Sequence, residues 1–109
     1  MIKFLRKLFG FPEIVLGVAR SPLWEKTRKV FLQFNPNCAV CGSNKDVVPH
    51  HIKPFHLYPE FELDLDNLIS LCERPKVLNC HLIFGHHGNF KKFNPDVVVE
   101  SSIWKKKLR

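Results

Sequence analysis

The chain has 109 residues, of which 45% are hydrophobic and 25% charged, and its formal net charge is +7 at pH 7. This length suits one small globular domain and excludes two, and the apolar runs fall short of the roughly 18 residues that a membrane span needs. The positive charge favours a polyanionic partner, although many small soluble proteins are also basic.

The N-terminal segment, Met1 to about Phe11, has apolar residues at helical spacing and basic residues on the other side. Its basic residues interrupt the apolar ones and no small-residue cleavage site follows, so we expect no secretory signal and a soluble, cytoplasmic protein. Residues 1–20 are interpreted as an extension that packs on its own domain, with DNA and a membrane surface as alternatives. The apolar run 13–19 fits either a strand or a helix.

A helix is predicted from Ser21 to Phe34. Ser21 can cap the first free amides, and Pro22 suits the first helical position. Apolar side chains then fall on one face and charged ones on the other, and Asn35-Pro36 ends the pattern. We expect this helix to pack in front of the rest of the domain.

The next segment brings two cysteines and two histidines close together in sequence. Cys38-Ala-Val-Cys41 predicts a tight turn, and residues 43–46 predict the loop of a hairpin. Residues 47–52 predict a strand that carries His50 and His51. Because side chains alternate along a strand, these two imidazoles are expected to point in opposite directions.

Shorter elements follow in the second half of the chain. Residues 53–62 contain two prolines and predict an irregular loop, and the run 64–71 is apolar or alternating. Residues 73–79 interrupt this pattern and are interpreted as an insertion. Residues 80–84 predict a short helix whose length glycine limits.

The segment 96–109 is interpreted as a basic C-terminal tail. Its valines at 97–99 suggest a strand, and its lysines are either solvated or in contact with phosphates. The candidate nucleic-acid contacts are the lysines Lys53, Lys91, Lys92, Lys105, Lys106 and Lys107.

Four cysteines fit either two disulfides in a secreted protein or one zinc site in a reducing compartment. The short gap between Cys38 and Cys41 favours zinc. Cys72 and Cys80 are more widely spaced, and the alternative for Cys72 is a buried apolar cysteine. Zinc bound by all four would stabilise so small a domain by about 10 kcal/mol or more.

The chain has six histidines, four of them in two adjacent pairs, which exceeds what polar packing in a small core needs. A phosphodiester resists attack because its charge repels nucleophiles and its leaving alkoxide is poor. A divalent cation relieves both difficulties, and an imidazole that is neutral near pH 7 can take a proton from water. His50 and His51, facing opposite ways, suit this division of labour.

These residues resemble the HNH endonucleases. The motifs that carry the resemblance, in the family's order, are Cys38-x-x-Cys41, Val48-Pro-His50-His51-Ile-x-Pro54, Asn67-Leu-Ile-x-Leu-Cys72 and Cys80-His81. The chain looks particularly like the small stand-alone HNH proteins of bacteriophages and bacteria. The resemblance implies a small α+β fold with a zinc-stapled ββα-metal core, a nuclease domain over residues 21–95, and a location in the cytoplasm of a bacterium or a phage-infected host cell.

The resemblance also implies a role for each matching position. His50 corresponds to a metal ligand and His51 to the general base, while His81 corresponds to a second ligand. Asn67 corresponds to the asparagine that fixes the loop and so orients His51. Magnesium, manganese or another divalent ion is implied, with products that end in 5′-phosphate and 3′-hydroxyl groups.

The chain departs from the family pattern just after His81. Many members carry another ligand one helical turn later, where this chain has Gly85. Residues five apart on an α-helix differ in direction by about 140°, so His86 can reach the same ion only if the helix ends or loosens at Gly85. We predict His86 as the ligand, with His87 as a substitute.

The function predicted from the sequence is metal-dependent hydrolysis of DNA, most simply double-stranded DNA. The main alternative is a non-catalytic zinc module that binds nucleic acid, and an RNA substrate is a third. Nicking, double-strand cleavage, a homodimer and a partner protein that directs cleavage all stay open at this point.

Overall fold

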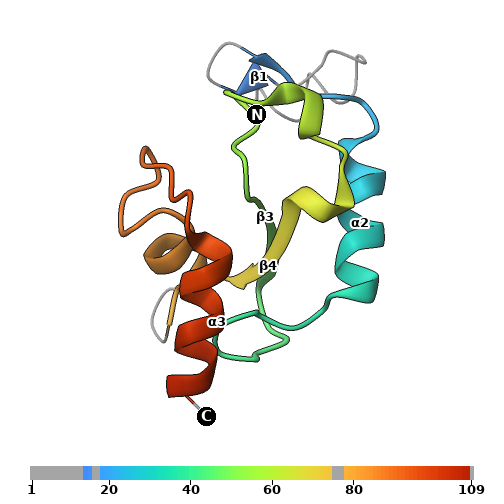
Figure 1. Ribbon diagram of the computed structural model, residues 1–109. Coiled ribbons are helices and arrows are strands. Elements are labelled where there is room, and N and C mark those ends of the chain that lie inside the picture. The colour runs from blue at the N-terminus through green and yellow to red at the C-terminus, as the bar shows by residue number, and fades with distance from the viewer. Residues whose placement is uncertain (1–13, 16–17, 75–77, 109) are drawn as a thin grey trace.

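An antiparallel pair of strands, β3 (Val47–His51) and β4 (Leu68–Cys72), lies at the centre of the computed structural model, which describes residues 14–15, 18–74 and 78–108 (Figure 1). In its register Val47 lies opposite Cys72, and His51 lies opposite Leu68. The pairing therefore holds a cysteine at one end of the ladder and the two histidines at the other.

The remaining elements are short. A small hairpin precedes the first long helix, and 3-10 turns fill the connection between β3 and β4. The elements are β1 (Ile14–Val15), β2 (Val18–Ala19), α2 (Trp24–Phe34), η1 (Pro59–Phe61), η2 (Leu65–Asn67), η3 (His81–Gly85) and α3 (Val97–Lys107). The fold is thus a small α+β arrangement of two-stranded sheets and helices.

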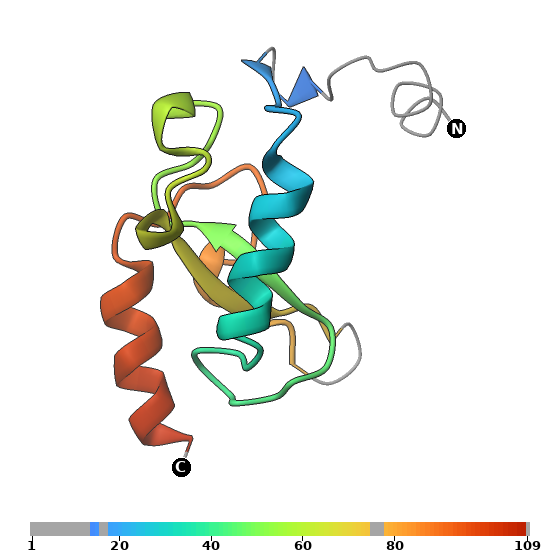
Figure 2. The same ribbon diagram turned by 90° about the vertical axis from the view of Figure 1, so that its right-hand side faces the viewer.

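Helices cover both faces of the β3–β4 pair. Figure 2 shows α2 in front of the pair and η3 behind it, with α3 to one side. On the α2 face Trp24 and Phe31 are buried against Leu68. On the η3 face a second core joins thiols and apolar side chains of distant segments, namely Cys38, Val40, Leu71, Cys72, Cys80, Phe84 and Val97.

The predicted helix after Ser21 is present, but it begins later than expected. Residues 22–23 form a turn and α2 starts at Trp24. Ser21 still stabilises this entry, because its Oγ accepts a hydrogen bond of 3.1 Å from the Leu23 amide. The prediction of a hairpin around residues 43–46 is wrong, because β3 pairs with β4 and not with the segment before this loop. The turn before the loop is closed by a hydrogen bond from the Cys38 amide to the Ser43 backbone oxygen.

The strand suggested by the three consecutive valines is a helix instead. The residues Val97, Ser101 and Trp104 fall on one face of α3; Val97 and Ser101 are buried, and the Trp104 ring lies 5.7 Å from that of Phe84. Burial of this face against the second core outweighs the weak β-propensity of valine. The basic segment is therefore fixed to the domain as α3.

Near the N-terminus, residues 14–15 pair with residues 18–19 as strands β1 and β2, so the described residues of the ambiguous run are strand. The amphipathic helix predicted over residues 1–11 lies outside the described residues. Within the described part of the chain, no helix combines the length and the apolarity needed to cross a membrane.

Candidate functional site

Four cysteine side chains converge at one end of the β3–β4 pair. Cys38 and Cys41 come from the turn after α2, Cys72 ends β4, and Cys80 directly precedes η3. Their sulfur atoms all lie within 4.8 Å of one another. An isolated bridge between Arg74 and Leu78 helps to close the widely spaced second pair. The alternative of an isolated buried Cys72 does not hold, because its Sγ lies 3.6 Å from that of Cys41.

The surroundings of this cluster favour a thiolate at Cys72, whereas burial raises the pKa of Cys80. Burial raises the pKa of Cys72. Hydrogen bonds from the Cys80 amide, the Arg74 guanidinium and neighbouring thiols outweigh this effect of burial, and they lower the pKa of Cys72 to about 7. Arg74 also donates to the Cys41 sulfur at 3.3 Å. Burial raises the pKa of Cys38, and a bound cation would reverse that shift because coordination deprotonates a thiol. Four sulfur ligands in this arrangement fit zinc.

Three histidines form a second cluster. Nδ1 of His50 lies 3.1 Å from Nε2 of His81, and Nε2 of His86 lies 3.2 Å from the same His81 nitrogen. His50 comes from β3, whereas His81 is the first residue of η3 and His86 directly follows η3. The structure therefore brings together the three histidines predicted as ligands of one ion.

In His81 and His86, the contacts of Nδ1 determine whether Nε2, which faces the cluster, carries a proton or a lone pair. Nδ1 of His86 donates to the Lys92 backbone oxygen at 2.9 Å, and Nδ1 of His81 lies 3.5 Å from a Glu73 carboxylate oxygen. A proton on each Nδ1 leaves a lone pair on each Nε2. Lone pairs that face each other at this distance repel, and a cation between them would relieve that repulsion.

Protonation does not relieve the repulsion at neutral pH. Burial, together with the neighbouring His81 and His86, lowers the pKa of His50 to about 3. Burial and His86 also lower the pKa of His81. The neutral imidazole is the form that binds metal, so His50 and His81 are held in the state that a divalent ion requires.

The shape of η3 explains why His86 joins the cluster. Residues His81–Gly85 form a π-helix, whose hydrogen bonds join residues five apart rather than four. The wider turn brings His86 back over His81. Gly85 takes no part as a ligand, and a Cβ there would lie 3.2 Å from the His50 and His81 rings. The predicted loosening at Gly85 is thus present in the structure.

His87 points away from the cluster. Its backbone has a positive φ of 50°, and its Nε2 lies 3.1 Å from the Glu100 carboxylate of α3. Asn94 donates to the same carboxylate and to the Phe84 oxygen, so this group ties α3 to η3. His87 therefore does not substitute for His86.

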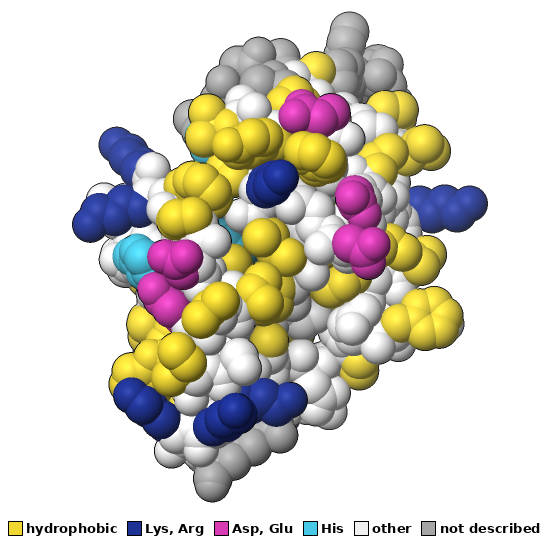
Figure 3. Space-filling model, viewed as in Figure 1, with side chains coloured by type: hydrophobic (Ala, Val, Ile, Leu, Met, Phe, Trp, Pro, Cys, Tyr) yellow, Lys and Arg dark blue, Asp and Glu magenta, His cyan; other side chains and the backbone are white. Residues whose placement is uncertain are grey.

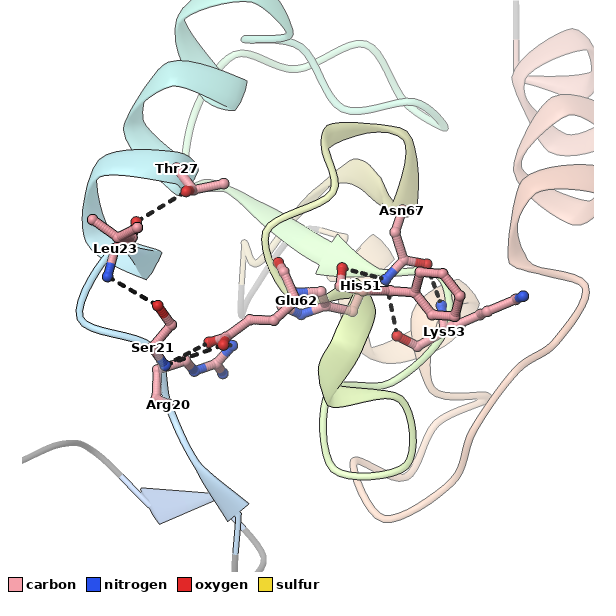
Figure 4. A network of polar contacts seen from close by, with 9 residues as sticks. Arg20, Ser21, Leu23, Thr27, His51, Lys53, Glu62 and Asn67 are labelled. Atoms are coloured by element: carbon pink, nitrogen blue, oxygen red, sulfur yellow. Dashed lines mark hydrogen bonds and ion pairs between the residues drawn. The ribbon is translucent and has the colours of Figure 1, made fainter.

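His51 lies on the other side of β3 from the histidine cluster. Its ring stacks on Trp24 with centroids 4.6 Å apart, and its Nε2 lies 2.9 Å from the Glu62 backbone oxygen (Figure 4). A carbonyl oxygen only accepts, so Nε2 carries the proton and Nδ1 keeps the lone pair. Burial lowers the pKa of His51, and nearby Arg20 adds to this effect against the opposing Glu62 contact. The ring is thus a neutral proton acceptor at neutral pH.

Asn67 fastens the connection that follows His51. Its side chain is buried, accepts from the Lys53 amide at 2.8 Å, and donates to the Lys53 and Phe61 oxygens. These contacts fix the chain just after His51 and just before Glu62. One asparagine therefore controls the position of both ends of the His51–Glu62 hydrogen bond.

The HNH endonuclease family model matches residues 38–86. This segment is similar to an HNH endonuclease domain. The match begins at Cys38 and ends at His86, so it contains every member of both clusters. No curated protein and no solved structure matches the chain.

Several contacts around the matched segment were not predicted from sequence. Glu62 anchors the segment before α2, because its buried carboxylate accepts from the Ser21 amide and pairs with Arg20 at 3.4 Å. Trp24 supports the His51 ring, and Glu73 approaches His81. No local pattern marks these residues. Glu62 acts on His51 through a backbone oxygen, which every residue type possesses.

The predicted lysines lie on three parts of the chain. The Lys53 amine sits 4.8 Å from the Phe61 ring centre, and the loop after η3 carries a second exposed pair. The last turn of α3 carries three more. Figure 3 shows basic side chains projecting over the η3–α3 loop and over the C-terminal end of α3. The lysines of these last two parts are Lys91, Lys92, Lys105, Lys106 and Lys107.

Proposed function

We propose that this protein is a metal-dependent endonuclease that hydrolyses DNA phosphodiester bonds. The observation that carries the proposal is the division between neighbouring imidazoles: His50 faces two further histidines, while His51 faces the Glu62 oxygen. The match of residues 38–86 to the HNH endonuclease family model supports the same reaction. A module that only binds nucleic acid needs neither group.

In the proposed mechanism His51 is the general base. Its Nδ1 takes a proton from the attacking water, while Nε2–H stays on the Glu62 oxygen and holds the ring plane. Asn67 is a positioning residue, because it fixes the segments on both sides of that hydrogen bond. The ring gains positive charge as it accepts the proton, and the Glu62 oxygen stabilises that charge.

His50, His81 and His86 would hold the catalytic ion. Their ring nitrogens converge, and imidazoles suit several divalent metals. A bound divalent ion would neutralise the phosphate and stabilise the leaving 3′ oxygen. Magnesium, manganese or another divalent ion is proposed here, and three imidazoles favour a transition metal over magnesium. Zinc is proposed at Cys38, Cys41, Cys72 and Cys80, and the products would carry 5′-phosphate and 3′-hydroxyl ends.

We propose further that β3, β4 and η3 form a ββα-metal core. The strand pair with a helix across it, carrying ligands from strand and helix, supports this assignment. The nuclease domain would span residues 21–95, with residues 1–20 as an extension and the basic segment 96–109 packed on it through α3. The net charge of +7 supports double-stranded DNA as the partner.

A plasmid-nicking assay with added manganese tests the proposal. Wild type should convert supercoiled plasmid to nicked or linear forms, and His51→Ala should be slower by at least about a hundredfold, as expected for loss of a general base. Equal nicking by both proteins would refute His51 as the base. The matched control is His56→Ala, which removes an imidazole from the adjoining loop and should cleave like wild type.

A further inference from the structure

The loop between η3 and α3 combines exposed aromatic and basic side chains. Phe90 is 53% exposed and Phe93 is 37% exposed, and Lys91 and Lys92 between them are also exposed. Single exposed apolar residues are ordinary on a protein surface. In the Phe-Lys-Lys-Phe run, two aromatic rings flank two positive charges. Aromatic stacking surfaces beside positive charges are the elements that bind unpaired nucleotides.

This loop is fixed to the histidine cluster. The Phe90 ring centre lies 5.5 Å from that of His81 and 5.1 Å from that of His86. The Lys92 backbone oxygen accepts from Nδ1 of His86, and Asn89 closes the turn by accepting from the amides of Lys91 and Lys92. The Phe90 ring therefore lies beside two metal-ligand candidates, tilted by 58° to each of them, and about half of this residue stays exposed.

The position of Phe90 beside the histidine cluster indicates which part of a bound nucleic acid would contact the exposed part of its ring. A phosphate bound at the histidine cluster brings its own nucleotide to the ring that borders the cluster. A nucleobase offers a flat surface of matching size, and Lys91 beside it can meet the next phosphate. Phe90 is held by a closed turn, so it offers this surface without an added cost of ordering the loop.

We propose that Phe90 stacks on the nucleobase next to the scissile phosphate, an inference that rests on the nuclease function proposed above. A base can stack on Phe90 only after it leaves its own stack. The preferred substrates are then DNA segments with an unpaired or easily unstacked nucleotide at the cleavage position. Intact duplex is cut more slowly because the unstacking free energy has to be supplied.

The first test uses an end-labelled single-stranded oligonucleotide with one reduced abasic residue, where removing the base costs only its stacking. Wild type should cut the phosphates beside the abasic residue on the order of tenfold less than the same phosphates in the intact strand. Phe90→Ala should cut both strands with the same pattern. Phe34→Ala, which removes an exposed ring at the end of α2, should keep the wild-type pattern. An abasic dip of equal depth in Phe90→Ala would overturn the proposal.

A second variant separates stacking from simple shielding of the histidines. Phe90→Leu keeps apolar cover on the imidazoles but has no flat ring, whereas Phe90→Tyr keeps the ring. If Phe90 stacks on a base, Phe90→Tyr should cut less beside the abasic residue, as wild type does, and should cut a duplex with an unpaired bubble faster than an intact duplex. Phe90→Leu should show neither preference, like Phe90→Ala. Restoration by Leu would show that shielding is the role and would overturn the stacking contact. Absence of any DNA cleavage by wild type would instead refute the proposed nuclease, so the two failures are distinguishable.

Discussion

Nε2 of His51 lies 2.9 Å from the backbone oxygen of Glu62, and this single contact fixes which nitrogen of the ring can act as a base. The proton stays on Nε2, so Nδ1 is the acceptor. The contact joins the end of β3 to the loop before η2, and Asn67 fastens the chain on both sides of it. The reactivity of His51 therefore depends on the geometry of the β3–β4 connection.

The pH dependence of cleavage should reflect this environment. Burial lowers the pKa of His51 from its ordinary value of 6.5, so the neutral base form persists as pH falls below 6.5 and is lost only through the lower pKa. We expect the acid limb of kcat/KM, measured with saturating manganese, to have its midpoint below 6.5. A midpoint at or above that value would contradict a buried, neutral base.

Gly85→Ala should weaken the histidine cluster. The new Cβ would lie 3.2 Å from His50 and His81 ring atoms, so both imidazoles must shift. We expect manganese affinity to fall by about tenfold or more, as when supports of a metal ligand are disturbed, while zinc content stays at wild-type level. Titration calorimetry measures the first and elemental analysis the second. Ile83→Ala, an exposed change on the same π-helix, is the control and should leave both unchanged.

Glu73→Ala should also weaken the catalytic ion, by a different route. The Glu73 carboxylate lies 3.5 Å from Nδ1 of His81 and favours the proton there, which leaves Nε2 free for metal. We expect a loss of about 10- to 100-fold in manganese affinity. Glu100→Ala removes the matching carboxylate beside His87 and should not change that affinity. Equal losses in both variants would indicate a general charge effect instead.

The sequence was sufficient for the parts of the site that motifs and alternation control. The cysteine gap, the adjacent histidines on a strand and the glycine after His81 predicted both clusters and the loosened helix. It was not sufficient for contacts made by backbone atoms or across distant segments. The three valines of α3 adopt a helix because the second core buries Val97, and no pattern within those residues reveals that core.

Cys38→Ser tests the cysteine cluster. Cys38 is buried and offers one of four converging sulfur atoms, so its loss should release zinc and remove much of a stabilisation on the order of 10 kcal/mol. We expect a loss of cooperative thermal melting together with loss of bound zinc. Ser43→Ala alters the same turn outside the cluster and should melt like wild type. An unchanged melting temperature in Cys38→Ser would refute a structural zinc site.

The lysines in the last turn of α3 should contribute to DNA binding, but not all equally. Successive residues on an α-helix differ in direction by about 100°, so Lys105 and Lys107 point about 200° apart and one duplex cannot meet all three lysines. Lys107 also lies over the Trp104 ring, with its amine 4.7 Å from the ring centre.

Each phosphate contact adds about 0.9 to the slope of log K against log salt. Replacing Lys105, Lys106 and Lys107 with alanine should therefore reduce that slope by about one to two, measured by fluorescence anisotropy in the His51→Ala background. Lys45→Ala, in the loop before β3, should leave the slope unchanged, and an unchanged slope in the triple variant would mean that the end of α3 is solvated in the complex.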